Sequence, residues 1–445
     1  MKKTIVAFLS LLMFAVLGME ARAQEKLTLT LDKSISLALS ENPRYLATQQ
    51  GVDAAQAQVR YAAAQFFPTF DANGMQNLDK KVFILDFPSF IPGGRPQRIP
   101  FDFTKTYQFT LNFTVPLFTG GRLTAGYRQA KYNLLATEEG VRQTSQETVL
   151  GVKKSFYTYL LTKELVKVTE EALGLAEKLL QNVKNMSEVG MASRLDLLRA
   201  EVRVSNLKPP VIQARNSVSV AELGLKTILG LDLAQPVEIV GELSYQPLEV
   251  NLQESLNKAM ANRPELSQLN YQKRIAGEME KIARASSLPT LAVSGNYNYW
   301  SNFFNFKRNN WESYYSFNLV LSIPIFQGLS TPAQVAQAKA QTRQIEFTER
   351  ALINQIKFEV ESAILNINQA KESLMSQEKN VEEAKESVRV AELNYTEGLI
   401  TITDVGAAQV ALSEARINYL RALYDYQIAQ AELEKATGTT WTPDE

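Results

Sequence analysis

The chain contains no cysteine and no histidine among its 445 residues. This composition removes thiolate nucleophiles, disulfides, imidazole acid–base catalysis and most zinc or copper sites. Catalysis would have to rest on carboxylates, hydroxyls and lysines. The adjacent acids Glu382 and Glu383 fit solvated charges on a helix face better than a catalytic pair. We therefore predict no enzyme, no catalytic residue, no cofactor and no metal ion.

Two carboxylates are marked out by their spacing, because Asp196 and Asp404 lie 208 residues apart in matching segments. Each falls in the first turn of a long predicted helix, where the helix N-terminus stabilises a carboxylate by about 0.3–1 kcal/mol. The alternative is a gate. If symmetry copies of Asp404 meet where a pore narrows, they form a cation-selective constriction. Both interpretations stay open at this point.

The helices that carry these two carboxylates have a continuous apolar seam. Apolar residues recur in steps of three and four over 197–228 and again over 405–436, which is the 3.5-residue period of a coiled coil. Gly190 and Gly398 keep the same offset as the seams. The chain is therefore an internal duplication, and each half ends in a long helix that packs against other helices.

The N-terminus predicts export. Lys2 and Lys3 precede an apolar run over 5–17 and an Ala-Arg-Ala site at 21–23, so residues 1–23 read as a cleaved signal peptide. A membrane anchor is the alternative, but the run is short for a span. Lysine plus arginine equals aspartate plus glutamate at 47 each, so we expect no nucleic-acid partner.

Between the predicted helices, the spacing at which apolar residues recur changes from 3.6 residues to 2 residues. Residues 107–115 alternate apolar and hydroxyl or amide side chains, and three further segments, one in the first half and two in the second, match this pattern less cleanly. The alternative is a half-buried sheet in a soluble domain, but the length and aromatic ends favour a membrane barrel. Four strands cannot close a barrel in lipid, and the polar inner face favours a twelve-stranded trimer over a solid eight-stranded dimer.

These patterns define the predicted domains. We expect a signal peptide (1–23), a first repeat (24–230), an equatorial linker (231–250), a second repeat (251–438) and a C-terminal tail (439–445). The first repeat should contain helices over 27–67, strands 69–78 and 105–117, a long helix 120–186, a turn 187–192 and a helix 193–229. The second should contain helices over 252–287, strands 290–300 and 312–325, a long helix 329–393, a turn 395–401 and a helix 402–436.

Two segments depart from regular patterns. Prolines and paired glycines over 80–102 predict an irregular external loop. Pro209 and Pro210 interrupt the hydrogen bonds of a predicted helix, but the seam continues past them in register, so we expect a bend there and not an end.

The junctions and turns carry recurring short sequences: Asn-Pro at a helix start, Val-Pro-Leu-Phe at 115–118, Ile-Pro-Ile-Phe at 323–326 and the turn sequence of 398–405. Together with the signal peptide and the duplicated halves, these residues resemble the TolC family of outer-membrane efflux proteins. The resemblance covers nearly the whole mature chain. The fold that it implies is an α+β membrane protein: a trimeric, 12-stranded outer-membrane β-barrel with four strands per chain, continued by a long periplasmic α-helical coiled-coil barrel. A solid coiled-coil rod is the alternative for the helices.

The resemblance also implies site residues. Polar links at the helical turns close the periplasmic aperture in this family, and the candidates here are Asp404, Asp196 and Tyr395. The family's closing arginine and second ring aspartate are Ile400 and Ala407 here, and Arg194 is a candidate substitute for the arginine. Adaptor docking is expected at the turns, with the candidates Gly190, Met191, Gly398 and Leu399.

The implied function is an exit duct of a tripartite efflux pump that exports small molecules across the outer membrane of a Gram-negative bacterium. The implied partners are two further copies in a homotrimer, outer-membrane lipid, a periplasmic adaptor and an inner-membrane pump of the RND or ABC type. The exit duct of a type I protein secretion system and a passive porin are the alternatives.

Overall fold

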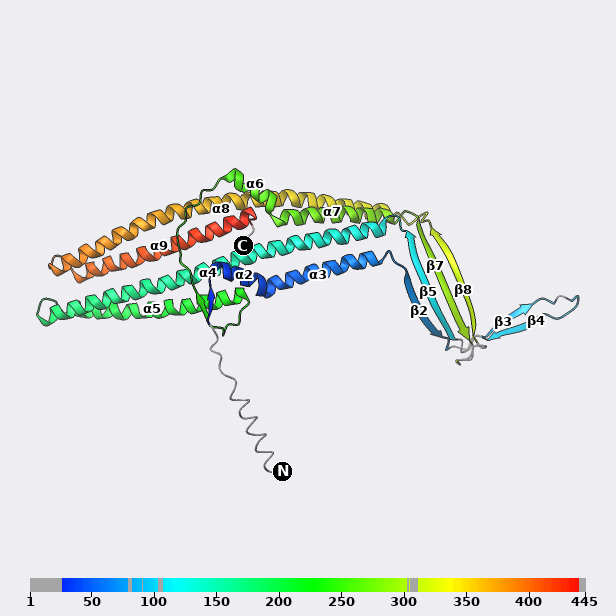
Figure 1. The fold of residues 1–445 in the computed structure, drawn as a ribbon, viewed down its shortest axis with the longest axis horizontal. Helices are drawn as coiled ribbons and strands as arrows, with labels where there is room; N and C mark the ends of the chain where they lie inside the picture. Colours follow the sequence, from blue (N-terminus) through cyan, green and yellow to red (C-terminus); the bar gives the residue numbers. More distant parts are fainter. Residues whose placement is uncertain are drawn as a thin grey trace, which may run out of the picture. The chain divides into compact units, whose positions relative to one another are not determined.

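The computed structural model describes residues 26–78, 82–89, 91–102, 107–301, 304 and 311–439. The predicted signal peptide and residues 440–445 of the predicted tail lie outside these ranges. The chain forms two compact units. Their helices and strands are labelled in Figure 1. One contains residues up to 50, 139–267 and 350 onwards, and the other contains 51–138 and 268–349. Each unit draws on both halves of the sequence.

The eight helices of the described residues repeat in two sets of equal length. The first set is α2 (Leu31–Glu41), α3 (Pro43–Ala64), α4 (Arg122–Glu188) and α5 (Arg194–Leu229), with 11, 22, 67 and 36 residues. The second set is α6 (Leu252–Asn262), α7 (Pro264–Ala285), α8 (Ser330–Thr396) and α9 (Ile402–Thr437), again with 11, 22, 67 and 36 residues. Four equal pairs of lengths in the same order show the duplication in the fold.

The predicted seams lie on the packed sides of α5 and α9. Val204, Val211 and Leu225 are buried on α5, and Leu412 and Tyr426 are buried on α9. Helix α5 continues through Pro209 and Pro210 without ending, as the unbroken seam predicts. Within the part of the chain that the structure describes, none of the helices has a stretch apolar enough and long enough to cross a bilayer.

A four-stranded antiparallel sheet belongs to the second unit. Its strands are β2 (Thr69–Gln76), β5 (Tyr107–Phe118), β7 (Thr290–Ser301) and β8 (Glu312–Ser322), in the order β2-β5-β7-β8. Both repeats thus contribute two neighbouring strands. The outer edges of β2 and β8 pair with no other strand of the described residues.

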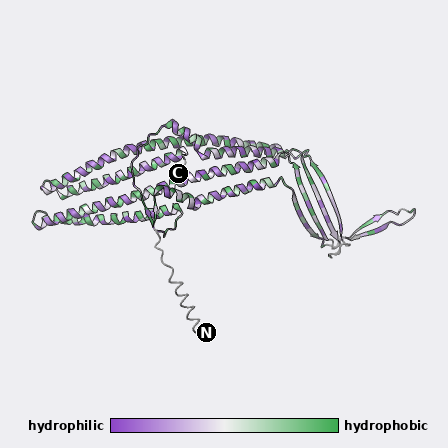
Figure 2. Cartoon of the chain, viewed as in Figure 1, coloured by the Kyte–Doolittle hydropathy of each residue, from purple (hydrophilic) through white to green (hydrophobic). Residues whose placement is uncertain are grey.

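The register gives this sheet one apolar and one polar face, because residues opposite one another on paired strands share a face. Figure 2 shows the alternation along the strands. The apolar face contains Phe70, Ala72, Phe109, Leu111, Phe113, Val293, Tyr297, Tyr299, Tyr315, Phe317, Leu319 and Leu321. On the polar face, Thr110 Oγ1 and Gln108 Nε2 donate to Asn298 Oδ1 at 2.8 and 3.1 Å. The alternation predicted from the sequence is confirmed.

Two short strand pairs were missed by the sequence analysis. Residues 27–29 were expected to begin a helix, but β1 (Leu27–Leu29) pairs in parallel with β6 (Val237–Ile239) of the linker. Leu29, Val237 and Ile239 are buried together in one core, and this tertiary pairing overrides the local helical pattern.

The expectation of an irregular loop over 80–102 is wrong. This segment contains β3 (Val82–Phe87) and β4 (Gln97–Asp102), which form an antiparallel hairpin. Most of its prolines and both glycines lie in the connection between the strands. Pro100 lies within β4, and a two-stranded sheet tolerates a proline because each strand has one edge without a partner strand among the described residues.

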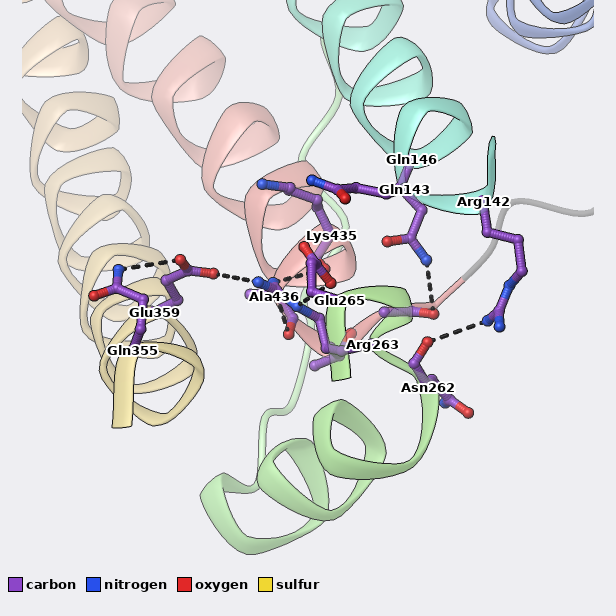
Figure 3. Close-up of polar contacts among 12 residues, drawn as sticks. Arg142, Gln143, Gln146, Asn262, Arg263, Glu265, Gln355, Glu359, Lys435 and Ala436 are labelled. Carbon is purple, nitrogen blue, oxygen red and sulfur yellow. Dashed lines mark hydrogen bonds and ion pairs between the residues drawn. The ribbon is translucent and has the colours of Figure 1, made fainter. Parts of the chain in front are cut away.

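The corner between α6 and α7 holds the end of α9 through a buried arginine (Figure 3). Arg263 is 3% exposed and donates to Glu359 Oε2 at 2.7 Å and to the carbonyl oxygens of Lys435 and Ala436 at 3.4 and 3.5 Å. Its Nε also lies 3.1 Å from a Glu265 carboxylate oxygen. Burial alone would raise the pKa of Glu359, but hydrogen bonds from Gln355 and Arg263 prevail and hold it below its ordinary value.

The first repeat builds the same corner with a neutral side chain. Asn42, between α2 and α3, donates from Nδ2 to the carbonyl oxygen of Ile228 at 2.7 Å. Ile228 and Ala436 are equivalent positions of the two repeats, so one carbonyl is capped by an amide and its counterpart by a guanidinium. Both corners fix a helix C-terminus that would otherwise leave backbone acceptors without partners.

Candidate functional site

The candidate site lies at the two turns that connect α4 to α5 and α8 to α9. Gly190 and Gly398 adopt φ angles of 81° and 76°, in the left-handed region that favours glycine. The N–H groups of Met191 and Leu399 donate to carbonyls five residues back, Met186 at 2.8 Å and Asn394 at 2.9 Å. This is the Schellman arrangement, which ends a helix and reverses the chain.

Asp196 caps the start of α5. Its Oδ2 accepts from the hydroxyl and the N–H of Ser193 at 2.6 and 3.2 Å, while the Asp196 N–H donates to Ser193 Oγ at 3.1 Å. Arg199 contributes an ion pair at 3.9 Å. The carboxylate therefore has the structural role expected of the first helical turn.

Asp404 has the equivalent role at the start of α9. Its Oδ2 accepts from the N–H and hydroxyl of Thr401 at 2.8 and 2.7 Å. These two hydrogen bonds lower the pKa of Asp404, so the group is ionised at neutral pH. A fixed negative charge at an exposed turn is the property that a carboxylate constriction needs.

Tyr395 and Asp196 come from different turns, and the charge of Asp196 acts on the Tyr395 phenol. The pKa of Tyr395 is raised, first by burial and then by the charge of Asp196. Tyr395 packs against a buried cluster of Leu179, Val183, Ala200, Ile402 and Val405, which we call the turn cluster. The turn cluster draws on α4, α5 and α9, so it joins the two helical hairpins next to their turns.

The candidate Arg194 is exposed. Arg199, and not Arg194, forms the ion pair with Asp196. No ion pair of the Arg194 side chain occurs within the described ranges, so its role as a substitute for the family's closing arginine stays a prediction.

Apolar side chains project from the outside of both turns. Met191 and Leu399, two of the predicted docking residues, are each 72% exposed, and Val189 is 70% exposed. Leu195, in the first turn of α5, is 56% exposed. These four residues form what we call the turn surface. Large apolar side chains that are exposed together at neighbouring turns mark an interaction surface.

Sequence reasoning missed one contact between helices α5 and α9, close to the turns. The guanidinium of Arg203 on α5 lies over Gly406 on α9, where an added Cβ would meet Arg203 Nη1 at 2.6 Å. Burial lowers the pKa of Arg203. Gln409, one turn along α9, is 4% exposed and donates weakly to Glu392 at 3.4 Å. A glycine inside a helix was the available signal, because it often marks a close approach.

The described residues of the turns offer surfaces for packing and for binding. No group of three or more acidic side chains that could hold a metal ion occurs within the described residues. The turns instead combine a joined pair of hairpins, two capped carboxylates and an exposed apolar surface.

The family model described as "Outer membrane efflux protein" matches residues 34–231 and 255–439. The two matched segments correspond to the two repeats of the fold, and together they cover most of the chain.

Curated relatives point to the same kind of protein. The chain is 25% identical over 319 residues to the probable efflux pump outer membrane protein TtgC of Pseudomonas putida, covering 70% of this chain and 62% of that protein. It is 26% identical over 323 residues to the outer membrane protein TolC of Vibrio cholerae, covering 70% of each. The chain thus matches less than two thirds of the length of the first of these relatives.

Solved structures share the fold over nearly the whole chain. The outer membrane protein VceC of Vibrio cholerae has a TM-score of 0.74 at 16% identity, covering 92% of this chain and 96% of that chain. The open state of the MtrE outer membrane channel of Neisseria gonorrhoeae has a TM-score of 0.73 at 19% identity, covering 92% and 88%. The predicted fold class is confirmed by these likenesses.

Proposed function

Because the chain belongs to the outer membrane efflux protein family, we propose that it is the outer-membrane exit duct of a tripartite pump that exports small molecules. The observation that carries this proposal is the two-faced sheet with two unpaired edges. An apolar face suits lipid, and a face of threonine, asparagine and glutamine suits a water-filled pore.

The unpaired edges support a trimer. Open strand edges are not tolerated in hydrocarbon, so β2 of one copy must pair with β8 of the next until the barrel closes. Three copies give about twelve strands, which leave room for a lumen, whereas eight strands are filled by side chains. Helix α5 supports the same assembly, since it exposes a second apolar stripe that comprises Leu195, Leu198, Val202, Ile212, Val220 and Leu223.

The helical hairpins are proposed to lie in the periplasm and to end at a closed aperture. Tyr395 near Asp196 would hold the two hairpins of one chain together, and ionised Asp404 residues of three chains would line the narrowest point. The turn surface would receive a periplasmic adaptor, which links the duct to an inner-membrane pump. A passive porin needs neither a closed aperture nor a docking surface.

Single-channel recordings in planar bilayers separate the duct from the porin. We expect the purified protein to conduct poorly and the double variant Asp404→Asn with Tyr395→Phe to raise its conductance about tenfold, since the open population rises when closed-state contacts are lost. Asparagine retains an acceptor for Thr401, and phenylalanine retains the ring packing, so both turns should persist.

Glu414→Gln is the matched control, because it removes an exposed carboxylate from the same helix α9 further from the turn. It should leave the conductance unchanged. Free conduction by the unmodified protein would contradict a closed aperture and favour the porin.

Photo-crosslinking in intact cells tests the docking surface. A photo-reactive residue at the exposed Glu397, beside the α8–α9 turn, should trap a periplasmic adaptor that mass spectrometry identifies together with its pump. The same residue at Glu372, exposed within α8, should trap little of it. A trimer that reaches the outer membrane but yields no adduct from Glu397 would contradict docking at the turns.

A further inference from the structure

We propose that the β3–β4 hairpin lies on the outer surface of the membrane, with one face against lipid. The proposal rests on the proposed function, since it needs the four-stranded sheet to stand in a bilayer. It assigns an interaction surface to a segment that the exit duct itself does not require.

The hairpin exposes large apolar side chains on an isolated two-stranded sheet. Ile84 and Leu85 are 61% and 50% exposed, Phe87 and Ile99 are 39% and 40% exposed, and Ile91 of the connection is 74% exposed. A two-stranded hairpin alone is marginally stable in water, and it needs a hydrophobic face packed on something. This much exposed apolar surface on so small a sheet marks an interaction site.

The two faces of the hairpin differ. Leu85 pairs with Ile99 and Phe87 with Gln97, so one face is apolar over these two pairs apart from a single amide. On the other face Asp86 pairs with Arg98, where the guanidinium Nε lies 3.0 Å from the carboxylate, and Ile84 pairs with Pro100. The ion pair is confined to this second face, and a sheet with charge on one face only is suited to the boundary between lipid and water.

The place where the hairpin leaves the sheet favours lipid as the occupant. It is inserted between the end of β2 at Gln76 and the start of β5 at Tyr107. Aromatic rings gather at this end of the apolar sheet face. Ring centroids are 5.1 Å apart for Tyr107 and Phe304, and 4.7 Å apart for Tyr299 and Trp311.

Trp311 also approaches Phe109, with ring centroids 5.7 Å apart. A band of tyrosine and tryptophan marks the level of the lipid headgroups. The hairpin is therefore inserted at the headgroup level, where its apolar face can lie against lipid and Arg95 in the connection can meet anionic phosphates.

Spin labels on single cysteines test this arrangement without background, because the chain has no cysteine of its own. The full chain, assembled in nanodiscs of phosphatidylethanolamine and phosphatidylglycerol, would carry one nitroxide at a time through Leu85→Cys or Ile84→Cys. These neighbours are both exposed but lie on opposite faces of the hairpin. The measurement is the collision rate with oxygen, which concentrates in lipid, relative to a water-soluble nickel chelate.

We expect the oxygen-to-nickel ratio to be several-fold higher at position 85 than at position 84. Leu319→Cys and Asn318→Cys on β8 supply the reference, since position 319 lies on the apolar face of the sheet and position 318 on the polar face. Position 85 should resemble position 319.

Equal ratios at 84 and 85, with position 319 in lipid, would overturn the hairpin proposal and leave the exit duct standing. A water-like ratio at position 319 would instead overturn the proposed function itself. Strong dipolar broadening between labels at position 85 would show that copies of this chain cover the apolar face, and it would also overturn lipid as the occupant.

Discussion

Arg263→Met should lower the free energy of unfolding by about 3–5 kcal/mol, because it removes one partner of a buried ion network. Methionine keeps the length of the side chain but leaves Glu359 and Glu265 without their cation. The carbonyls of Lys435 and Ala436 would also lose their donor. Urea unfolding of the purified protein in detergent, followed by far-ultraviolet circular dichroism at constant protein concentration, measures the loss.

Arg284→Met is the matched control on the adjoining helix α7. Arg284 pairs with Glu280 at 2.5 Å, but its side chain is 58% exposed. An exposed pair contributes about 0–1 kcal/mol, so this variant should unfold almost as the parent does. If the two substitutions lower the free energy of unfolding by the same small amount, the corner at Arg263 does not hold the end of α9.

Gly230→Ala should be the most damaging of the small substitutions. Gly230 has a φ of 75°, and an added Cβ would lie 2.4 Å from the carbonyl oxygen of Glu41. Backbone at that distance must move, which would separate α5 from the corner between α2 and α3. We expect a loss of about 3 kcal/mol or more, measured by the same urea unfolding.

Gly190→Ala separates the two causes of that loss. Gly190 has a φ of 81°, but nothing lies within 4 Å of its added Cβ. It should therefore show the cost of the left-handed conformation alone, about 1–2 kcal/mol. If the two variants lose the same free energy of unfolding, the clash of the added Cβ with the Glu41 carbonyl adds no further cost.

Periodicity was enough to predict most of the fold. The 3.5-residue seam identified α5 and α9, and the two-residue alternation of 107–115 identified the faces of the sheet. Both patterns are local, since each is imposed by burial along one element. At the turns, the matched spacing of Gly190 and Gly398 marked the two positions that adopt a positive φ, which glycine permits because it has no Cβ.

The missed features depend on partners far along the chain. Leu27–Leu29 resembles a helix start until β6 is present to pair with it. Arg203 looks like any exposed arginine until Gly406 of α9 lies under its guanidinium. The β3–β4 hairpin was hidden by its prolines, which signal irregular structure although most of them lie outside the paired strands. The roles of Arg194, Asp404 and the turn surface stay predictions, because assembly with other chains decides them.

The pairing of β1 with β6 also sets an order of folding. Leu29 shares its core with Val237 and Ile239, and these residues lie beyond the whole first repeat. In a chain that emerges from its N-terminus, β1 has no strand to pair with until residue 239 has been released. Such non-local closure is slow and exposes apolar surface meanwhile. The first repeat alone therefore lacks the strand that completes its core, and the unfinished chain is the stage at which a holding chaperone would have an apolar edge to bind.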